Sequence, residues 1–271
     1  MPYCRVKKAN IYYEVIGSGT PVVMIHGFTL DHRAMKGCME PIFQERTGYR
    51  RIYLDLPGMG LTKDYDEVGN TDDMLKTVTD FIDVILPDQP FLIIGYSYGG
   101  YLTRGVIANM PERVLGAAFI CPVIIADKTK RSLPEHKVMH RDEEFIATLN
   151  AEEKEFYENS FVMLNQNNWN RAKDELVVGM KVADQSFLEK IQKAYGYSFA
   201  IDEGTFEKPS LFLVGRQDNV TGYSDAFNIL KKYPRATYTV LDTAGHNLQI
   251  EQAELVNGHI SEWLERVSRF V

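Results

Sequence analysis

Residues 91–100 read FLIIGYSYGG, an apolar run that ends in glycines spaced around Ser97. A continuous apolar run of this length fits a strand that is buried on both faces of a sheet. The glycines two residues before and after Ser97 permit a sharp turn, because side chains there would collide with neighbouring backbone. Helical spacing from Tyr101 to Met110 follows directly. A strand, a sharp turn and a helix in this order predict that the Ser97 hydroxyl projects from one end of a sheet.

Strands and helices alternate along most of the chain. The pattern predicts an N-terminal hairpin, followed by strands that are separated by helical stretches. This alternation is typical of an α/β protein with a mostly parallel central sheet and helices on both faces. The predicted strands are 3–6, 11–16, 22–25, 52–54, 91–94, 114–120, 211–214 and 237–241, and the predicted helices are 74–86, 101–110, 223–230 and 248–267.

The strand pattern disappears between Pro122 and Lys208, where the apolar spacing becomes helical. We predict an inserted helical lid at residues 123–206 and a core made of residues 1–122 and 207–271. A length of 271 residues fits one large domain that carries such an insertion. Some of the lid's large apolar side chains are candidates for lining a substrate pocket, while most hold the lid together. They are Phe145, Phe156, Phe161, Met163, Trp169, Met180, Phe187, Tyr195, Tyr197 and Phe199.

Composition and charge narrow the class of protein. Hydrophobic residues make up 45% of the chain and charged residues 25%, as in ordinary globular proteins. The 30 basic and 37 acidic residues give a net charge of -7, which opposes binding to a phosphate backbone or an anionic membrane. We therefore expect no nucleic-acid or membrane partner. The oligomeric state stays open.

The apolar runs and the cysteines of the chain indicate in which cellular compartment the protein is expected. The chain has no apolar run of membrane-spanning length, and its first residues lack the apolar stretch of a secretory signal. Cys4, Cys38 and Cys121 are odd in number and far apart, so they predict neither a disulfide framework nor a paired-cysteine zinc site. We expect a cytoplasmic protein.

A serine hydroxyl needs a base to become nucleophilic, and the base is usually a histidine that a carboxylate orients. Asp218 follows the predicted strand 211–214, and His246 follows the predicted strand 237–241. The ends of parallel strands meet at one edge of a sheet, so both side chains are expected near Ser97. Asp127 and Asp242 remain alternative acids.

An oxyanion needs two N–H donors held in place beforehand. The residue after the nucleophile, Tyr98, supplies one backbone N–H in the predicted site. Phe28, in the loop after strand 22–25, supplies the other. We interpret His26 as a structural hydrogen bonder, because His246 is better placed in the chain to act as the base.

Two patterns that resemble ligand sites are set aside. His136 and His140 have the spacing of metal ligands on a helix, but Lys137 stands where a zinc protease carries glutamate. Gly58-Met59-Gly60 lacks the third glycine and the strand-to-helix setting of a dinucleotide loop. We expect no cofactor and no metal.

The chain resembles the α/β-hydrolase superfamily, specifically its lid-bearing serine hydrolases, over nearly all of its length. Position 62 carries threonine where the family usually has serine, a departure that does not touch the predicted triad. The resemblance rests on His26-Gly27-Phe28, Asp55-Leu56-Pro57-Gly58-Met59-Gly60, Gly95 to Gly99, Gly215 to Asp218, and Gly245-His246.

The resemblance implies hydrolysis of a small, largely apolar carboxylic ester through an acyl-enzyme, with Ser97, His246 and Asp218 as catalytic residues. Serine at position 97 disfavours the relatives with an aspartate nucleophile, namely haloalkane dehalogenases and epoxide hydrolases. Relatives with the same triad include carbon-carbon bond (dienoate) hydrolases, thioesterases, lactonases and proline iminopeptidases. Small-ligand receptors of this superfamily also keep the triad, so a ligand sensor is a further alternative. These alternatives stay open.

Overall fold

The central sheet has eight strands, and it lies at the middle of a computed structural model that describes residues 3–270. The first two strands are antiparallel to their neighbours and form the expected hairpin, while all later neighbours are parallel. Across the sheet the order is β1 (Tyr3–Val6), β2 (Ala9–Ile16), β4 (Tyr49–Leu54), β3 (Thr20–Ile25), β5 (Phe91–Tyr96), β6 (Val114–Ile120), β9 (Ser210–Gly215) and β10 (Ala236–Leu241).

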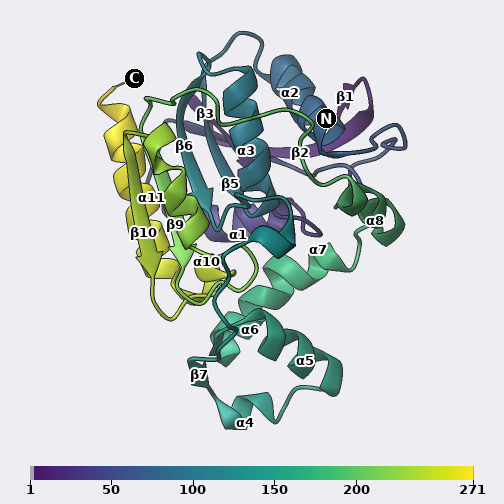
Figure 1. The fold of residues 1–271 in the computed structure, drawn as a ribbon, viewed down its shortest axis with the longest axis vertical. Coiled ribbons are helices and arrows are strands. Elements are labelled where there is room, and N and C mark those ends of the chain that lie inside the picture. Colours follow the sequence, from purple (N-terminus) through teal and green to yellow (C-terminus); the bar gives the residue numbers. More distant parts are fainter. Residues whose placement is uncertain (1–2, 271) are drawn as a thin grey trace.

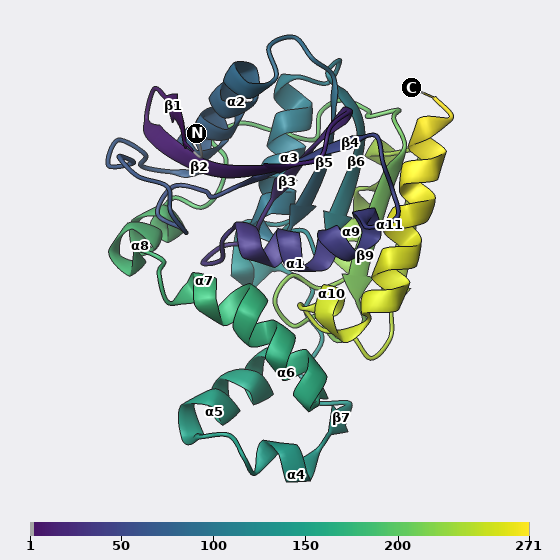
Figure 2. The ribbon, with the colours of Figure 1, turned by 180° about the vertical axis from the view of Figure 1, so that it is seen from behind.

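Helices cover both faces of this sheet, which confirms the predicted architecture (Figures 1 and 2). Side chains alternate along each buried strand between two cores: Val23 and Ile25 of β3 pack on one side, and Val22 and Met24 on the other. The helices of this part are α1 (His32–Phe43), α2 (Thr71–Ile85), α3 (Tyr98–Asn109), α9 (Ser224–Asn228), the short 3₁₀ helix η3 (Leu230–Lys232), α10 (Leu248–Glu251) and α11 (Ala253–Ser268).

In the chain between β6 and β9, the short helices of residues 143–180 project past one end of the sheet, whereas the helix of residues 185–193 lies beside the sheet and packs into its core (Figure 1). Three elements of this segment follow one another directly, and the middle one is a π-helical turn. The elements are η1 (Lys128–Lys130), β7 (His140–Arg141), α4 (Glu143–Ile146), α5 (Ala151–Ser160), β8 (Met163–Leu164), α6 (Gln166–Ala172), the π turn η2 (Lys173–Val177), α7 (Val178–Met180) and α8 (Gln185–Lys193).

Two helices differ from the sequence prediction. The sequence pattern does not predict α1, because Gly37 and Pro41 lie inside it and lower helix propensity. Packing of its buried face compensates for them. The single helix predicted at 248–267 is two helices that meet at Gln252. Leu255, on the second of these helices, is half exposed.

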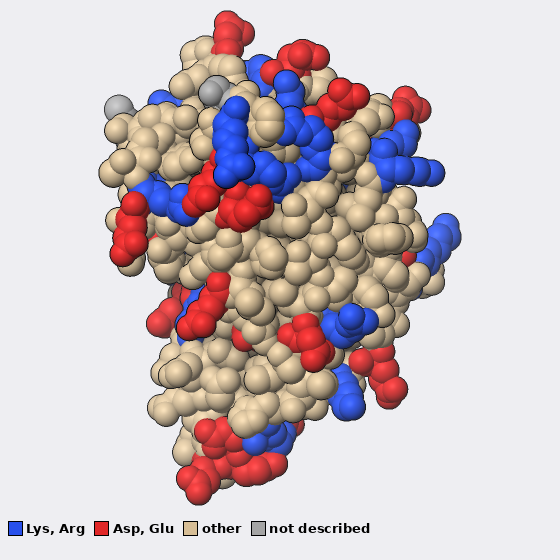
Figure 3. Space-filling model, turned by 90° about the vertical axis from the view of Figure 1, so that its left-hand side faces the viewer, with Lys and Arg blue, Asp and Glu red and all other residues tan. Residues whose placement is uncertain are grey.

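Charged side chains on the surface are unevenly spread. On the side shown in Figure 3, lysines and arginines gather toward the upper end among acidic neighbours, and a wide area below carries few charges. Within residues 3–270 no helix combines the length and the apolar character needed to cross a membrane.

We expect Trp263→Ala to lower the free energy of unfolding by about 3–5 kcal/mol, the usual cost of removing a large buried aromatic ring. The Trp263 side chain is 0% exposed, and its Nε1–H donates to the Pro209 carbonyl at 3.0 Å. Urea unfolding followed by circular dichroism measures the loss. The control is Leu255→Ala on the same helix, where the side chain is 50% exposed and little should change. Equal losses in both variants would contradict this packing.

Candidate active site

Ser97 lies at a sharp turn between β5 and α3, as the sequence predicts. Its backbone has φ 54° and ψ -114°, a conformation that side chains other than glycine rarely adopt. A Cβ at Gly99 would collide with the Ile25 carbonyl of β3, and one at Gly95 would collide with the Gly99 carbonyl. The two glycines therefore let the turn pack directly against the neighbouring strand.

Ser97, His246 and Asp218 form a continuous chain of hydrogen bonds. The Ser97 Oγ lies 2.9 Å from His246 Nε2, and His246 Nδ1 lies 3.0 Å from Asp218 Oδ2. The three residues follow β5, β10 and β9, whose carboxyl ends share one edge of the sheet. The structure thus brings these three separated residues together at one edge of the sheet.

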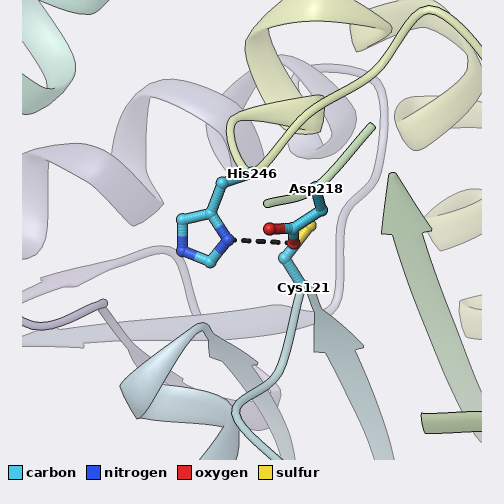
Figure 4. Close-up of side chains that lie close together, drawn as sticks. All are labelled: Cys121, Asp218 and His246. Carbon is cyan, nitrogen blue, oxygen red and sulfur yellow. Dashed lines mark hydrogen bonds and ion pairs between the residues drawn. The ribbon is translucent and has the colours of Figure 1, made fainter. Parts of the chain in front are cut away.

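The Asp218 carboxylate is fully buried, and Figure 4 shows its hydrogen bond to His246. Besides His246, the Thr221 hydroxyl donates to Oδ2 at 2.7 Å, and the N–H groups of Val220 and Thr221 donate to Oδ1. Burial favours the neutral acid, but the charge of His246 and these hydrogen bonds outweigh it and lower the pKa of Asp218 to about 2. Asp218 is therefore ionised at neutral pH and orients the imidazole.

The two alternative acids lie elsewhere. Asp127 is exposed and caps η1 by accepting from the Thr129 backbone N–H and hydroxyl. Asp242 is also exposed, and its Oδ1 accepts from Gln217 Nε2 at 2.8 Å. Within the described part of the chain, Asp218 is the acid whose carboxylate contacts His246.

The backbone N–H groups of Phe28 and Tyr98 flank Ser97. Tyr98 begins α3, where the first amides of a helix have no partner within the helix. Between residues 3 and 270, neither amide donates a backbone hydrogen bond in a turn or loop. Gly27 lies so close that a Cβ there would be 3.2 Å from the Ser97 Cβ. Tyr98 directly follows Ser97 in the chain, and Phe28 lines the same cavity as Ser97.

His26 holds this loop in place, consistent with its structural interpretation. The Leu56 N–H donates to His26 Nε2 at 3.0 Å, so the Nδ1 of the ring carries the hydrogen that it shares with the Gly27 carbonyl at 2.7 Å. Burial lowers the pKa of His26, which keeps the ring neutral. Both ring nitrogens are occupied, and His26 takes no part in the chain at Ser97.

A cavity of about 170 Å³ opens above Ser97. Its walls come from the loop after β3, from the loop that holds His246, and from the segment between β6 and β9. The lining residues are Gly27, Phe28, Thr29, Leu30, Tyr96, Ser97, Phe156, Asn159, Ser160, Leu176, Met180, Val220, His246 and Asn247.

Two groups of side chains have the composition of metal ligands. Cys121 lies with Asp218 and His246 (Figure 4), and Asp31 lies with His32 and Asp55. Burial raises the pKa of the Cys121 thiol well above its usual range, which disfavours the thiolate that a metal prefers. Asp31 is paired with Arg33, and Asp55 accepts from the His32 backbone at 2.7 Å. Hydrogen bonds within the protein thus occupy the carboxylates of both groups.

Glu251 is a buried acid next to the site that the sequence analysis missed. One carboxylate oxygen accepts from the Gly245 N–H at 2.6 Å, directly before His246. The other accepts from the N–H groups of Val162 and Met163 at 2.6 and 3.2 Å. Burial raises the pKa of Glu251 to about 7, although these three donors favour the charged form. Glu251 therefore links the His246 loop to the segment between β6 and β9.

Comparison with known proteins supports the observed fold. The sequence model of the alpha/beta hydrolase fold family matches residues 20–253. A solved alpha/beta superfamily hydrolase from Oenococcus oeni PSU-1 is 30% identical and has a TM-score of 0.90, with 99% of this chain and 100% of that chain covered.

More distant relatives carry the names of esterases. The pimeloyl-[acyl-carrier protein] methyl ester esterase of Legionella pneumophila (strain Corby) is 23% identical over 258 residues, which are 94% of this chain and 100% of that protein. The solved esterase of Exiguobacterium antarcticum is 18% identical, with a TM-score of 0.69 over 95% of this chain and 96% of the other.

We expect Glu251→Gln to remove a pH dependence of stability. The folded protein keeps the Glu251 proton up to about pH 7, whereas an ordinary glutamate loses it near 4.5. The folded state then binds the extra proton between these values, so the free energy of unfolding falls as pH rises through this interval, by up to about 3 kcal/mol. Urea unfolding of wild type and variant at about pH 5 and about pH 8 measures the difference.

The matched control is Glu254→Gln, which changes an exposed glutamate close to Glu251 in sequence and should keep the wild-type pH dependence. If Glu251→Gln and wild type lose stability in parallel as pH rises, Glu251 is not the group that titrates.

Proposed function

The chain belongs to the α/β-hydrolase fold family of enzymes, and we propose that it is a serine hydrolase that cleaves a small, largely apolar carboxylic ester. The hydrogen-bonded chain from Ser97 through His246 to Asp218 carries this proposal. It joins a nucleophile, a base and an acid that orients the base, which are the parts that acyl transfer requires.

In the proposed first step, His246 Nε2 takes the proton of Ser97 while Oγ attacks the ester carbonyl. Asp218 holds the Nδ1–H and stabilises the imidazolium that forms. The negative oxygen of the tetrahedral intermediate accepts hydrogen bonds from the N–H groups of Phe28 and Tyr98. Collapse of the intermediate breaks the ester bond, and His246 passes its proton to the departing alcohol.

The acyl-enzyme is then hydrolysed by the same groups. Water replaces the alcohol, His246 takes one of its protons, and the resulting hydroxide attacks the acyl carbonyl. Collapse of the second intermediate breaks the bond to Ser97 Oγ and releases the acid, and His246 returns the proton to Oγ. These steps use side chains and backbone amides of this chain, so the proposed reaction requires no cofactor or metal.

The size and walls of the Ser97 cavity support the proposed substrate class. A cavity of about 150 Å³ lined by apolar side chains accommodates benzene, so a volume of about 170 Å³ suits a group of similar size. Leu30, Leu176 and Val220 give apolar walls. An uncharged short chain or a single ring fits there better than a charged group, whose water would be lost.

We also propose that residues 123–206 act as a lid over this site. Phe156, Leu176 and Met180 of that segment line the Ser97 cavity from the side opposite the sheet. The name of the Legionella relative, a methyl ester esterase, supports ester cleavage as the reaction.

We expect Ser97→Ala to lower kcat on p-nitrophenyl acetate on the order of 10⁶-fold, the loss typical of a closely coupled triad. Steady-state hydrolysis measures the change, and labelling with a fluorophosphonate followed by peptide mapping should identify Ser97. The control is Ser160→Ala, a second serine on the wall of the same cavity, which should keep the wild-type rate. Near wild-type turnover by Ser97→Ala would refute the proposal.

We expect Asp218→Asn to lower kcat by about 10⁴-fold, because an amide cannot hold the imidazole in the required tautomer. The same assay measures it. Asp242→Asn and Asp127→Asn are the controls, since both change exposed carboxylates that make no contact with His246. A large loss in either control together with a small one in Asp218→Asn would move the role to the other acid.

A further inference from the structure

A second, larger cavity lies within the segment between β6 and β9. Its volume is about 480 Å³, and α5, α6, the π turn and α7 form its walls. Two side chains, Phe156 and Met180, line both this outer cavity and the cavity above Ser97. The lining residues are Asn150, Glu152, Glu153, Phe156, Trp169, Lys173, Val177, Val178, Met180 and Lys181.

The π turn distributes its side chains between the two cavities. Leu176 lines the cavity above Ser97, while its neighbour Val177 and the earlier Lys173 line the outer cavity. Glu175 points the other way, against Gly37 of α1, and pairs with Arg171. A π turn widens the helix by one residue, and such turns occur often at functional sites.

Phe156 and Met180 form a partition between the cavities. Both side chains are only partly buried, although they lie between two apolar spaces. The Phe156 ring leans against Trp169, with ring centroids 6.3 Å apart. Met180 has an unbranched side chain that changes rotamer easily. Because these two side chains line both cavities, a shift of either side chain would change the separation between the two spaces.

The outer cavity has apolar walls and charges of both signs. Phe156, Trp169 and Met180 contribute large apolar surfaces. Two glutamates, Glu152 and Glu153, and two lysines, Lys173 and Lys181, also line it, so their formal charges cancel. The Lys173 ammonium lies 6.0 Å from the centre of the Trp169 ring. These walls favour a neutral apolar chain over a charged one.

We propose that the outer cavity binds a neutral aliphatic chain of the substrate that passes between Phe156 and Met180. The inference rests on the proposed function and refines it: the ester carries one short group at Ser97 and one medium-length chain. Each methylene that leaves water contributes about 0.8 kcal/mol, which corresponds to about fourfold in kcat/KM.

Filling the outer cavity tests the proposal. Val178 lines the outer cavity and not the cavity above Ser97, so Val178→Trp should block the chain without touching the reacting groups. We expect kcat/KM on p-nitrophenyl octanoate or on octyl acetate to fall about tenfold or more, as if two methylenes stayed in water. Activity on p-nitrophenyl acetate should stay within about twofold of wild type. The two long esters distinguish an acyl chain from an alcohol chain.

Two further variants guard against a folding defect. Val177→Phe fills the same cavity with a smaller ring and should give the same selective loss. Val182→Trp places the same large ring on a side chain that is 52% exposed and outside both cavities, and it should match wild type on every ester. A carboxylate at the end of the octanoate chain should lower kcat/KM, because binding in the outer cavity would remove water from the charged group at a cost in free energy.

Equal responses of short and long esters to Val178→Trp and Val177→Phe would overturn the proposal, and so would a preference for the carboxylate-ended chain. Ester cleavage by Ser97 is tested separately, because that proposal fails only if hydrolysis of p-nitrophenyl acetate does not depend on Ser97.

Discussion

The active-site arrangement depends on one strained turn at the centre of the sheet. The positive φ of Ser97 costs about 1–3 kcal/mol, and it persists because the surrounding strands hold it. Gly99 presses against the Ile25 carbonyl of β3, and the Ser97 N–H donates to the Ile120 carbonyl of β6. The turn is therefore held by the strands on both sides of β5. Relaxation of φ would move the Ser97 hydroxyl away from His246. The packing of the sheet therefore keeps the hydroxyl within hydrogen-bond distance of the imidazole.

The proposed base, His246, and the proposed acid, Asp218, depend on the sheet in a different way. Asp218 and His246 lie in loops after β9 and β10, toward one side of the sheet, and loops need further bonds to keep an imidazole within 3 Å of its partners. Thr221 and two backbone amides fix Asp218, while Glu251 fixes the residue before His246. Because Glu251 also accepts from the Val162 N–H, it connects the segment between β6 and β9 to the loop that holds His246.

The sequence predicted the features that local chemistry controls and missed those that arise from tertiary contacts. The turn at Ser97 was predictable because the glycines it needs stand at fixed offsets. Asp218 and His246 followed from their places after strands. In contrast, α1 contains Gly37 and Pro41 and forms because its buried face packs in the core. The contacts of Glu251 also involve the backbone amides of Val162 and Met163, which lie far away in the sequence, so no local pattern predicts them.

The two cavities bear on how such an enzyme uses binding energy. Contacts in the outer cavity lie away from the reacting carbonyl, so they bind ground state and transition state alike and raise kcat/KM without raising kcat. They also raise kcat if the bound chain holds the carbonyl next to the N–H groups of Phe28 and Tyr98. The carbonyl is then already oriented for attack, so less entropy is lost in the chemical step. The partition makes this coupling possible, since Phe156 and Met180 contact both spaces. A longer substrate chain should therefore mainly lower KM if Phe156 and Met180 leave the bound chain mobile. It should also raise kcat if these two side chains hold the chain in one position.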